Sequence, residues 1–151
     1  MLVIKDPADF QNHAGKRLGV SEWRTVDQAL IDQYAELSGD RQWIHVDVER
    51  CKREAPGGKT IAHGYLVLSI MSLMAPQIWT VAKRSRALNY GLNKLRFTGT
   101  VPSGSRVRLN QGIKTVEPIE NGFRVSFDSV VEVEGQERPA LVAEQVIVWF
   151  N

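Results

Sequence analysis

The segment IAHGYLVLSIMSLMAPQIW, residues 61–79, predicts a helix at the centre of the protein. Between Tyr65 and Ala75, nine of eleven residues are apolar, and they fall on every face of a helix. A helix that is apolar all round is typical of a buried core element. The run is shorter than the ~20 residues that cross a bilayer, so we expect a buried helix and no membrane span.

The chain after this helix is patterned as long strands. Residues 87–97, 106–116, 123–134 and 140–150 are rich in β-branched and aromatic side chains and are separated by turn sequences such as PSGS and PIENG. Gly91 indicates a bulge in the first strand. Sequential strands joined by short turns predict an antiparallel meander. We therefore expect a single α+β domain over residues 1–151, with the antiparallel sheet wrapped around the long central helix.

The chain before the central helix is predicted to be mainly helical. A short opening helix is expected over residues 7–13. A longer helix is expected in TVDQALIDQYAELSGD, residues 25–40, where Thr25 and Gln28 form a capping box and Gly39 is the C-terminal stop.

A turn is expected where this helix ends, in SGDRQWIHVD, residues 38–47, because Asp47 suits the N-cap of another short helix over residues 48–54. On an unbroken helix, Asp40 and His45 would point about 140° apart. A turn can bring the two side chains together. An aspartate and a histidine that reach one water can supply both proton transfers of a hydration. The alternative reading is an ordinary turn aspartate and a partly buried imidazole.

Composition excludes several classes of protein. The 151 residues are 43% hydrophobic and 24% charged, with a formal net charge of +2, so neither disorder nor nucleic-acid binding is indicated. Cys51 is the only cysteine, which excludes an internal disulfide and a cysteine-based zinc site. No base is expected beside this thiol, and we predict that it is inert. The first residues are too short an apolar run for a secretory signal, so we expect a cytoplasmic protein.

Two motifs together resemble one known family, the MaoC-like dehydratases or R-specific enoyl-CoA hydratases of the hotdog superfamily. The chain has Ser-Gly-Asp at residues 38–40, His45 five residues after that aspartate, Asp47 two further on, and Ala-His-Gly at residues 62–64 opening the central helix. The resemblance covers most of the chain and is weaker before residue 17.

This resemblance implies a hotdog fold and a reversible syn hydration of trans-2-enoyl-CoA to (R)-3-hydroxyacyl-CoA. It implies that Asp40 and His45 hold and activate one water, while the backbone N–H of Gly64 binds the thioester oxygen. The residues support the last point independently. An N–H in the first turn of a helix has no partner within the helix and lies at the positive end of its dipole, as an oxyanion site requires.

Further residues are expected near this site. His63 stands at the start of the central helix, where we favour a structural role over a catalytic one. Trp43 is expected to line the pocket. The commonest family version has Asn-Pro where this chain has Gln42-Trp43, a difference that bears on the shape of the acyl pocket beside the pair. Tyr90 and Asn93 flank the bulge at Gly91 and are expected to reach the site. We expect neither a metal nor a cofactor.

Other functions remain open on the sequence. One is a hotdog acyl-CoA thioesterase, against which the pairing of Asp40 with His45 argues; another is a non-catalytic acyl-binding or partner subunit. The expected partners are the acyl-CoA substrate and a second copy of the chain, because a small sheet on one helix leaves an edge strand to be covered. The basic run KRSR, residues 83–86, reads as a solvated helix end or as a site for the phosphates of coenzyme A.

Overall fold

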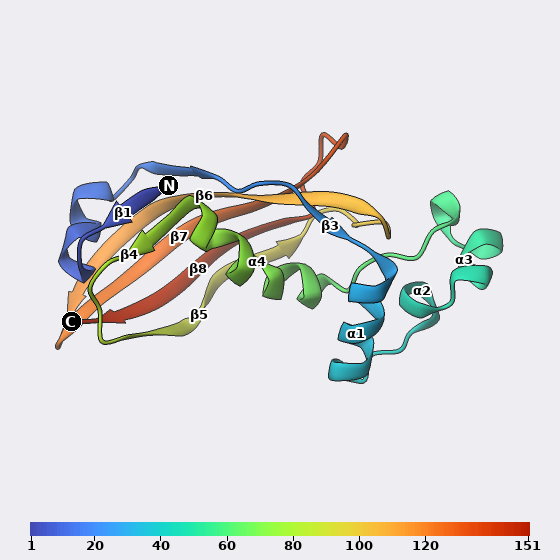
Figure 1. Ribbon diagram of the computed structural model, residues 1–151, viewed down its shortest axis with the longest axis horizontal. Helices are drawn as coiled ribbons and strands as arrows, with labels where there is room; N and C mark the ends of the chain where they lie inside the picture. The colour runs from blue at the N-terminus through green and yellow to red at the C-terminus, as the bar shows by residue number, and fades with distance from the viewer.

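The structure is a computed structural model that describes all 151 residues. Its long elements are a central helix and four strands, preceded by short helices and short strands (Figure 1). In chain order they are β1 (Leu2–Ile4), the 3₁₀ helix η1 (Pro7–His13), β2 (Arg17–Val20), β3 (Arg24–Val26), α1 (Gln28–Ser38), α2 (Trp43–Val46), α3 (Val48–Glu54), the 3₁₀ helix η2 (Pro56–Gly58), α4 (Gly64–Ile78), β4 (Trp79–Val81), β5 (Arg86–Phe97), β6 (Ser105–Ile119), β7 (Gly122–Val133) and β8 (Leu141–Phe150).

A curved antiparallel sheet carries the fold. Its strands follow the order β2-β6-β7-β8-β5, and β3 also pairs with β6. Helix α4 lies along the sheet, while α1, α2 and α3 gather beyond the end of the sheet where α4 begins (Figure 1). The predicted α+β arrangement, a sheet wrapped on one long helix, is confirmed. No helix is both long enough and apolar enough to cross a membrane.

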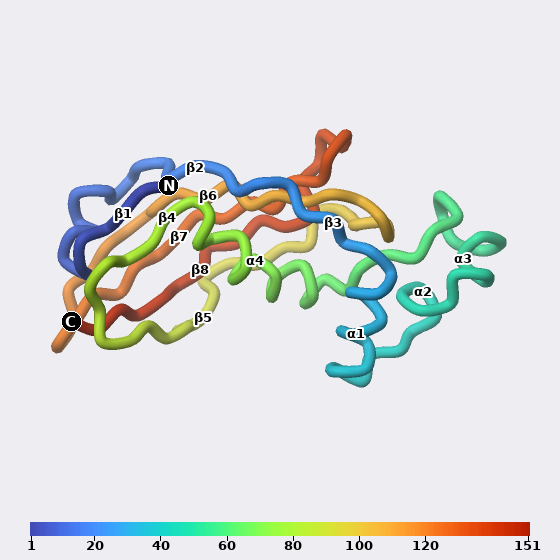
Figure 2. Tube along the Cα trace, in the orientation of Figure 1, coloured from blue at the N-terminus to red at the C-terminus, as the bar shows by residue number.

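The predicted meander is only partly correct. Strands β6, β7 and β8 pair in sequence, but β5 pairs with β8 and not with β6 (Figure 2). The connection from β5 to β6, residues 98–104, is not a tight turn, and backbone hydrogen bonds hold it to other elements. The N–H of Thr98 donates to the Ala140 carbonyl at 2.9 Å, and the N–H of Gly104 donates to the Val26 carbonyl at 2.8 Å. Because β5 pairs with β8 alone, it lies at the edge of the sheet.

Short strands account for the largest omissions of the sequence prediction. Strands β1 to β4 have three or four residues each, which is too few to show an alternating pattern. Strand β1 pairs in parallel with β4, the strand that directly follows α4. The basic run at residues 83–86 therefore follows a strand, and its prediction as a helix end is wrong. The register shift between Asn89 and Gly91 confirms the predicted bulge in β5.

The helices before α4 begin and end largely as predicted. Gly39 adopts the left-handed conformation, with φ +78°, that ends α1, and the carboxylate of Asp47 caps α3 by accepting from the N–H of Arg50 at 2.9 Å. The predicted capping box of Thr25 and Gln28 is wrong. Thr25 belongs to β3, and the carboxylate of Asp27 caps α1 instead, accepting from the N–H of Leu30.

Helix α4 is buried on one face only, so its predicted burial all round is wrong for the single chain. The buried side chains include Leu66, Ile70 and Met74. Tyr65 and Leu73 point away from this core and are 65% and 55% exposed. The exposed face lies beside β5, as the edge-to-face contact between Tyr65 and Phe97 shows, with ring centroids 5.8 Å apart. An apolar face of the chain is thus left uncovered.

Candidate active site

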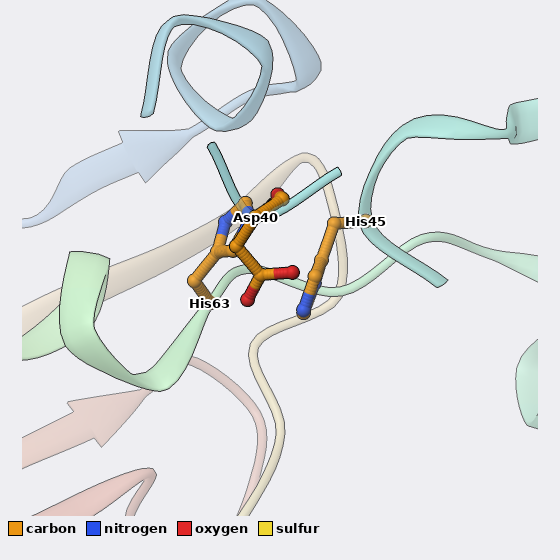
Figure 3. A group of neighbouring side chains, drawn as sticks. All are labelled: Asp40, His45 and His63. Carbon is orange, nitrogen blue, oxygen red and sulfur yellow. The ribbon is translucent and has the colours of Figure 1, made fainter. Parts of the chain in front are cut away.

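Three side chains meet near the start of α4, where the predicted turn lies. Asp40, His45 and His63 each place one oxygen or nitrogen atom within 4.8 Å of the others (Figure 3). His45 and His63 are buried, whereas Asp40 is exposed. The structure therefore brings together Asp40 and His45, the two residues that the sequence pairs, and adds His63 to them.

Local chain geometry explains how five residues of separation are closed. After Gly39 turns the chain, the N–H of Asp40 donates to the hydroxyl of Ser38 at 3.2 Å, and a carboxylate oxygen of Asp40 accepts from the N–H of Gln42 at 3.3 Å. The chain then makes the single helical turn α2, which carries His45. The predicted inter-helix segment is thus a polar turn followed by a one-turn helix. In Figure 3 the carboxylate of Asp40 is turned toward the ring of His45.

The tautomer of His45 follows from its hydrogen bond. Its Nδ1 lies 2.7 Å from the carbonyl oxygen of Ile61. A carbonyl only accepts, so we assign the hydrogen to Nδ1. In the neutral ring, Nε2 then carries the lone pair and can accept a proton. The segment is held further by Gln28, whose side-chain amide donates to the His45 carbonyl at 2.7 Å.

His63 binds a carbonyl oxygen through its other ring nitrogen, Nε2. Its Nε2 lies 2.8 Å from the carbonyl oxygen of Asp40 and, by the same argument, donates to it. Its Nδ1 is buried and has no partner in the protein. Through this bond, the residue at the N-cap position of α4 fixes the backbone of the Asp40 turn.

The two imidazoles are stacked, with centroids 3.8 Å apart and planes 26° from parallel. Two histidines and a carboxylate form a donor set that zinc accepts in other proteins. A stacked pair, however, directs its in-plane lone pairs alongside each other and not at one point. Such a pair does not present the convergent nitrogen donors of a tetrahedral zinc site.

A pocket of about 320 Å³ opens beside His45, at the N-terminus of α4. Its walls include Gly64, Phe97 and the loop of residues 98–101. No side chain caps the helix at this end. A Cβ atom on Gly64 would lie 3.0 Å from the ring of Phe97, so any other residue here would require this ring to shift. The N–H groups of the first helical turn have no partners within the helix and can bind an oxygen atom in the pocket.

The other predicted site residues lie elsewhere in the single chain. Trp43 does not line this pocket; its ring lies under the guanidinium of Arg50, 4.1 Å from the ring centroid. Tyr90 is exposed on β5, and Asn93 donates to a carboxylate oxygen of Glu144 at 2.7 Å. That hydrogen bond, together with the nearby lysines, lowers the pKa of Glu144. Roles for Trp43, Tyr90 and Asn93 in the site stay predictions.

Sequence reasoning missed three contributors to the site. The carbonyl of Ile61 orients His45, the ring of Phe97 walls the pocket, and Tyr34 packs its ring 5.0 Å from that of His63. A backbone carbonyl gives no signal in a sequence. Tyr34 could have been found, because it occupies the position one helical turn before Ser38 and therefore faces the Asp40 turn.

The fold defines a class of protein. A curved antiparallel sheet wrapped on a central helix is the hotdog fold. The profile of the MaoC like domain matches residues 9–134, and the chain belongs to this MaoC-like dehydratase family.

Individual relatives cover nearly the whole chain. It is 42% identical over 148 residues to 3-hydroxyacyl-thioester dehydratase Z of Mycobacterium tuberculosis, covering 97% of each protein. It is 40% identical over 146 residues to nodulation protein N of Rhizobium leguminosarum biovar viciae, covering 93% of this chain and 89% of the relative. An unliganded R-hydratase from Pseudomonas aeruginosa superposes with a TM-score of 0.74 at 20% identity, covering 91% of this chain and 82% of that one. The last likeness shows a shared hotdog fold.

Proposed function

We propose that the protein is a hydro-lyase that adds water reversibly to trans-2-enoyl-CoA and forms (R)-3-hydroxyacyl-CoA. The observation that carries the proposal is the meeting of Asp40 and His45 beside the open N-terminus of α4. The relative named 3-hydroxyacyl-thioester dehydratase supports the substrate class and the reaction type. The R configuration rests on the resemblance to R-specific hydratases.

In the proposed reaction, one water lies between the carboxylate of Asp40 and Nε2 of His45. As the water oxygen bonds to C3 of the substrate, a water proton passes to this pair, and the tautomer of His45 supports Nε2 as the acceptor. The pair then supplies a proton to C2. The hydroxyl group and the hydrogen both come from the side of the substrate that faces the pair, so the addition is syn, and the pair ends with the protons it began with.

The thioester oxygen gains negative charge while C3 is attacked. We place this oxygen at the N–H of Gly64, in the pocket that His45 also lines. A preorganised backbone donor at a helix N-terminus stabilises such a charge without moving during the reaction. The exclusion of a side chain at position 64 keeps room for the thioester beside Phe97.

A direct assay tests the proposal. Purified protein is mixed with crotonyl-CoA, and the enoyl-thioester absorbance is followed together with the release of free thiol. Loss of absorbance without thiol is expected for wild type and for His13→Gln, a variant of the histidine in η1, and is expected to be greatly slowed in His45→Gln. Release of thiol would identify a thioesterase, and binding without any reaction would identify a non-catalytic subunit.

We also propose that two copies associate through β5. The strand is a free sheet edge and is exposed along its length, and the apolar side chains of Tyr65 and Leu73 lie on the adjoining face of α4. An exposed, long apolar edge is rarely left uncovered in a stable protein. Pairing of β5 with β5 of a second copy gives a closed homodimer. We place this dimer in the cytoplasm, a location that the free thiol of Cys51 supports.

A further inference from the structure

The side chain of Gln28 joins three separate segments near the candidate active site. Gln28 is the first residue of α1, and its amide nitrogen donates to the backbone carbonyl of His45 at 2.7 Å and to the carboxylate of Asp32 at 2.8 Å. Its amide oxygen accepts from the hydroxyl of Thr60 at 2.5 Å. One side chain therefore ties α1 to the helical turn α2 and to the segment that precedes α4.

The orientation of this amide follows from its partners. A backbone carbonyl and an ionised carboxylate only accept, so the side of the amide that faces His45 and Asp32 carries the hydrogens. The amide oxygen then faces Thr60, whose hydroxyl can donate to it. A flipped amide would place its oxygen against two acceptors. Gln28 is thus held in one orientation, with both amide hydrogens and the amide oxygen in use.

Thr60 completes the arrangement from the protein interior. The residue is 2% exposed, and its hydroxyl makes no hydrogen bond other than the one to Gln28. The next residue, Ile61, accepts from the ring of His45 through its carbonyl, and its N–H donates to the carbonyl of Ile44 at 3.0 Å. Residues 60 and 61 therefore hold the turn α2 in three ways, one of which passes through Gln28.

The turn α2 depends on such contacts from outside. It has only four residues, Trp43–Val46, and no side chain caps its N-terminus. A single helical turn is unstable by itself, because its formation fixes several residues for one hydrogen bond. The place of the free Nε2 of His45 relative to the Asp40 carboxylate therefore depends on the groups that hold α2.

We infer that Gln28 is a positioning residue for the proton acceptor of the proposed reaction, and that Thr60 keeps the amide of Gln28 in the working orientation. Together they hold the main chain of His45, while the Ile61 carbonyl holds its ring. Neither Gln28 nor Thr60 lines the pocket beside His45, so both act through this histidine and not on the substrate. The inference rests on the proposed function.

Steady-state kinetics with crotonyl-CoA test the inference. Gln28→Met keeps the length of the side chain and removes its hydrogen bonds, so kcat should fall roughly 10–100-fold through misplacement of His45, with KM changed less than about twofold. Thr60→Val should lower kcat by a smaller factor, whereas Thr60→Ser, which keeps the hydroxyl, should retain the wild-type kcat. Gln33→Met, a change at an exposed position of the same helix, is the matched control and should have no effect.

Two double variants separate positioning from stability. In the background of His45→Gln, which has no proton acceptor to position, Gln28→Met should cost little more, because the two residues act as a unit. The full additional loss of kcat in this background would overturn the inference. Gln28→Met with Thr60→Val leaves no orphaned hydroxyl and should regain melting temperature but not kcat. Recovery of kcat together with stability would show a merely structural role.

A measurement without substrate keeps the inference separate from the proposed reaction. With ¹⁵N labelling, the ring nitrogens of the three histidines can be followed, and the two nitrogens of a neutral ring differ with its tautomer. The His45 signals, identified by their absence in His45→Gln, should move in Gln28→Met, whereas those of His13 should not. Unmoved His45 signals overturn the inference even if crotonyl-CoA is hydrated. Moved signals in a protein that does not hydrate crotonyl-CoA would reject the proposed reaction and retain the support of His45 by Gln28.

Discussion

The imidazole rings of His45 and His63 stack face to face, 3.8 Å apart, yet each ring is fixed by a different backbone carbonyl. His45 uses Nδ1 to bind the carbonyl of Ile61 and keeps Nε2 free. His63 uses Nε2 to bind the carbonyl of Asp40. The two histidines are therefore held in one stack by separate contacts: His45 keeps free the nitrogen that we propose takes the proton, and His63 supports the Asp40 turn.

The proposed pair of Asp40 and His45 predicts the size and the coupling of two mutational effects. His45→Gln retains hydrogen-bonding capacity but cannot take a proton, and we expect kcat for crotonyl-CoA to fall roughly 10²–10⁴-fold. Asp40→Asn should cost a similar factor. The double variant should lose little more than the worse single one, because both residues act on one water. Multiplicative losses in steady-state kinetics would show that the residues do not act as a unit.

His63 should behave as a positioning residue. His63→Asn shortens the side chain and removes the hydrogen bond to the Asp40 carbonyl, so the turn should loosen and kcat should fall less than in His45→Gln. The pH profile of kcat should keep its shape, since the proton acceptor is unchanged. A loss equal to that of His45→Gln, at an unchanged melting temperature, would mean that the pair has been assigned to the wrong histidine.

Substitutions at Gly64 distinguish loss of the N–H from loss of space. Gly64→Pro deletes the N–H and should abolish turnover. Gly64→Ala keeps the N–H but brings a methyl group within 3.0 Å of the Phe97 ring, so kcat/KM should fall through crowding. The double variant Gly64→Ala with Phe97→Leu should recover part of that loss. If it recovers nothing while the fold is retained, crowding by Phe97 is not the cause.

The proposed dimer predicts a particle of twice the 17.0 kDa chain mass in light scattering at micromolar concentration. Leu88→Asp places a charge on the free edge strand, where Leu88 is 53% exposed, and should shift the equilibrium toward monomer. Leu37→Asp is the matched control, because Leu37 is also exposed, at 85%, but lies on α1. A wild-type mass of one chain would contradict the dimer.

Cys51 should be unreactive in the folded protein. The residue is fully buried, and this burial raises the pKa of its thiol. A thiol reagent at pH 8 should therefore react only after denaturant is added. As the pH rises, the thiol loses its proton in the unfolded chain before it does so in the folded protein. The contribution of this group to the free energy of unfolding is therefore fully present below the ordinary pKa of about 9 and declines above it. In Cys51→Ala, the loss of unfolding free energy with rising pH should be smaller; an unchanged slope would exclude this contribution.

The predictable part of the fold depended on long patterns. The central helix, the four long strands and the stop at Gly39 follow from periodicity and glycine chemistry, and the structure agrees. Strands of three or four residues form because β6 and β4 offer partners, and no local pattern announces them. The capping residue of α1 was misassigned because Thr25 also suits a strand, and pairing with β6 took it there.

The burial of α4 shows a different limit. An apolar residue at 65 or 73 predicts that the face is covered, and the pattern does not say by what. Within one chain Tyr65 and Leu73 are exposed, so the same signal that predicted a core position also fits a subunit contact. At the site, the meeting of Asp40 and His45 was predictable from the turn between two helices and from the family resemblance, but the Ile61 carbonyl that sets the tautomer was not.

The pairing of β5 with β8 imposes an order on the assembly of the protein. Strand β5 ends at residue 97, but its only partner within the chain is the last strand, at residues 141–150. During synthesis, β5 therefore has no ladder to join until β8 has left the ribosome. The edge that we propose a second copy recognises is complete only after β8 has paired with β5, so association of two copies follows the folding of the sheet.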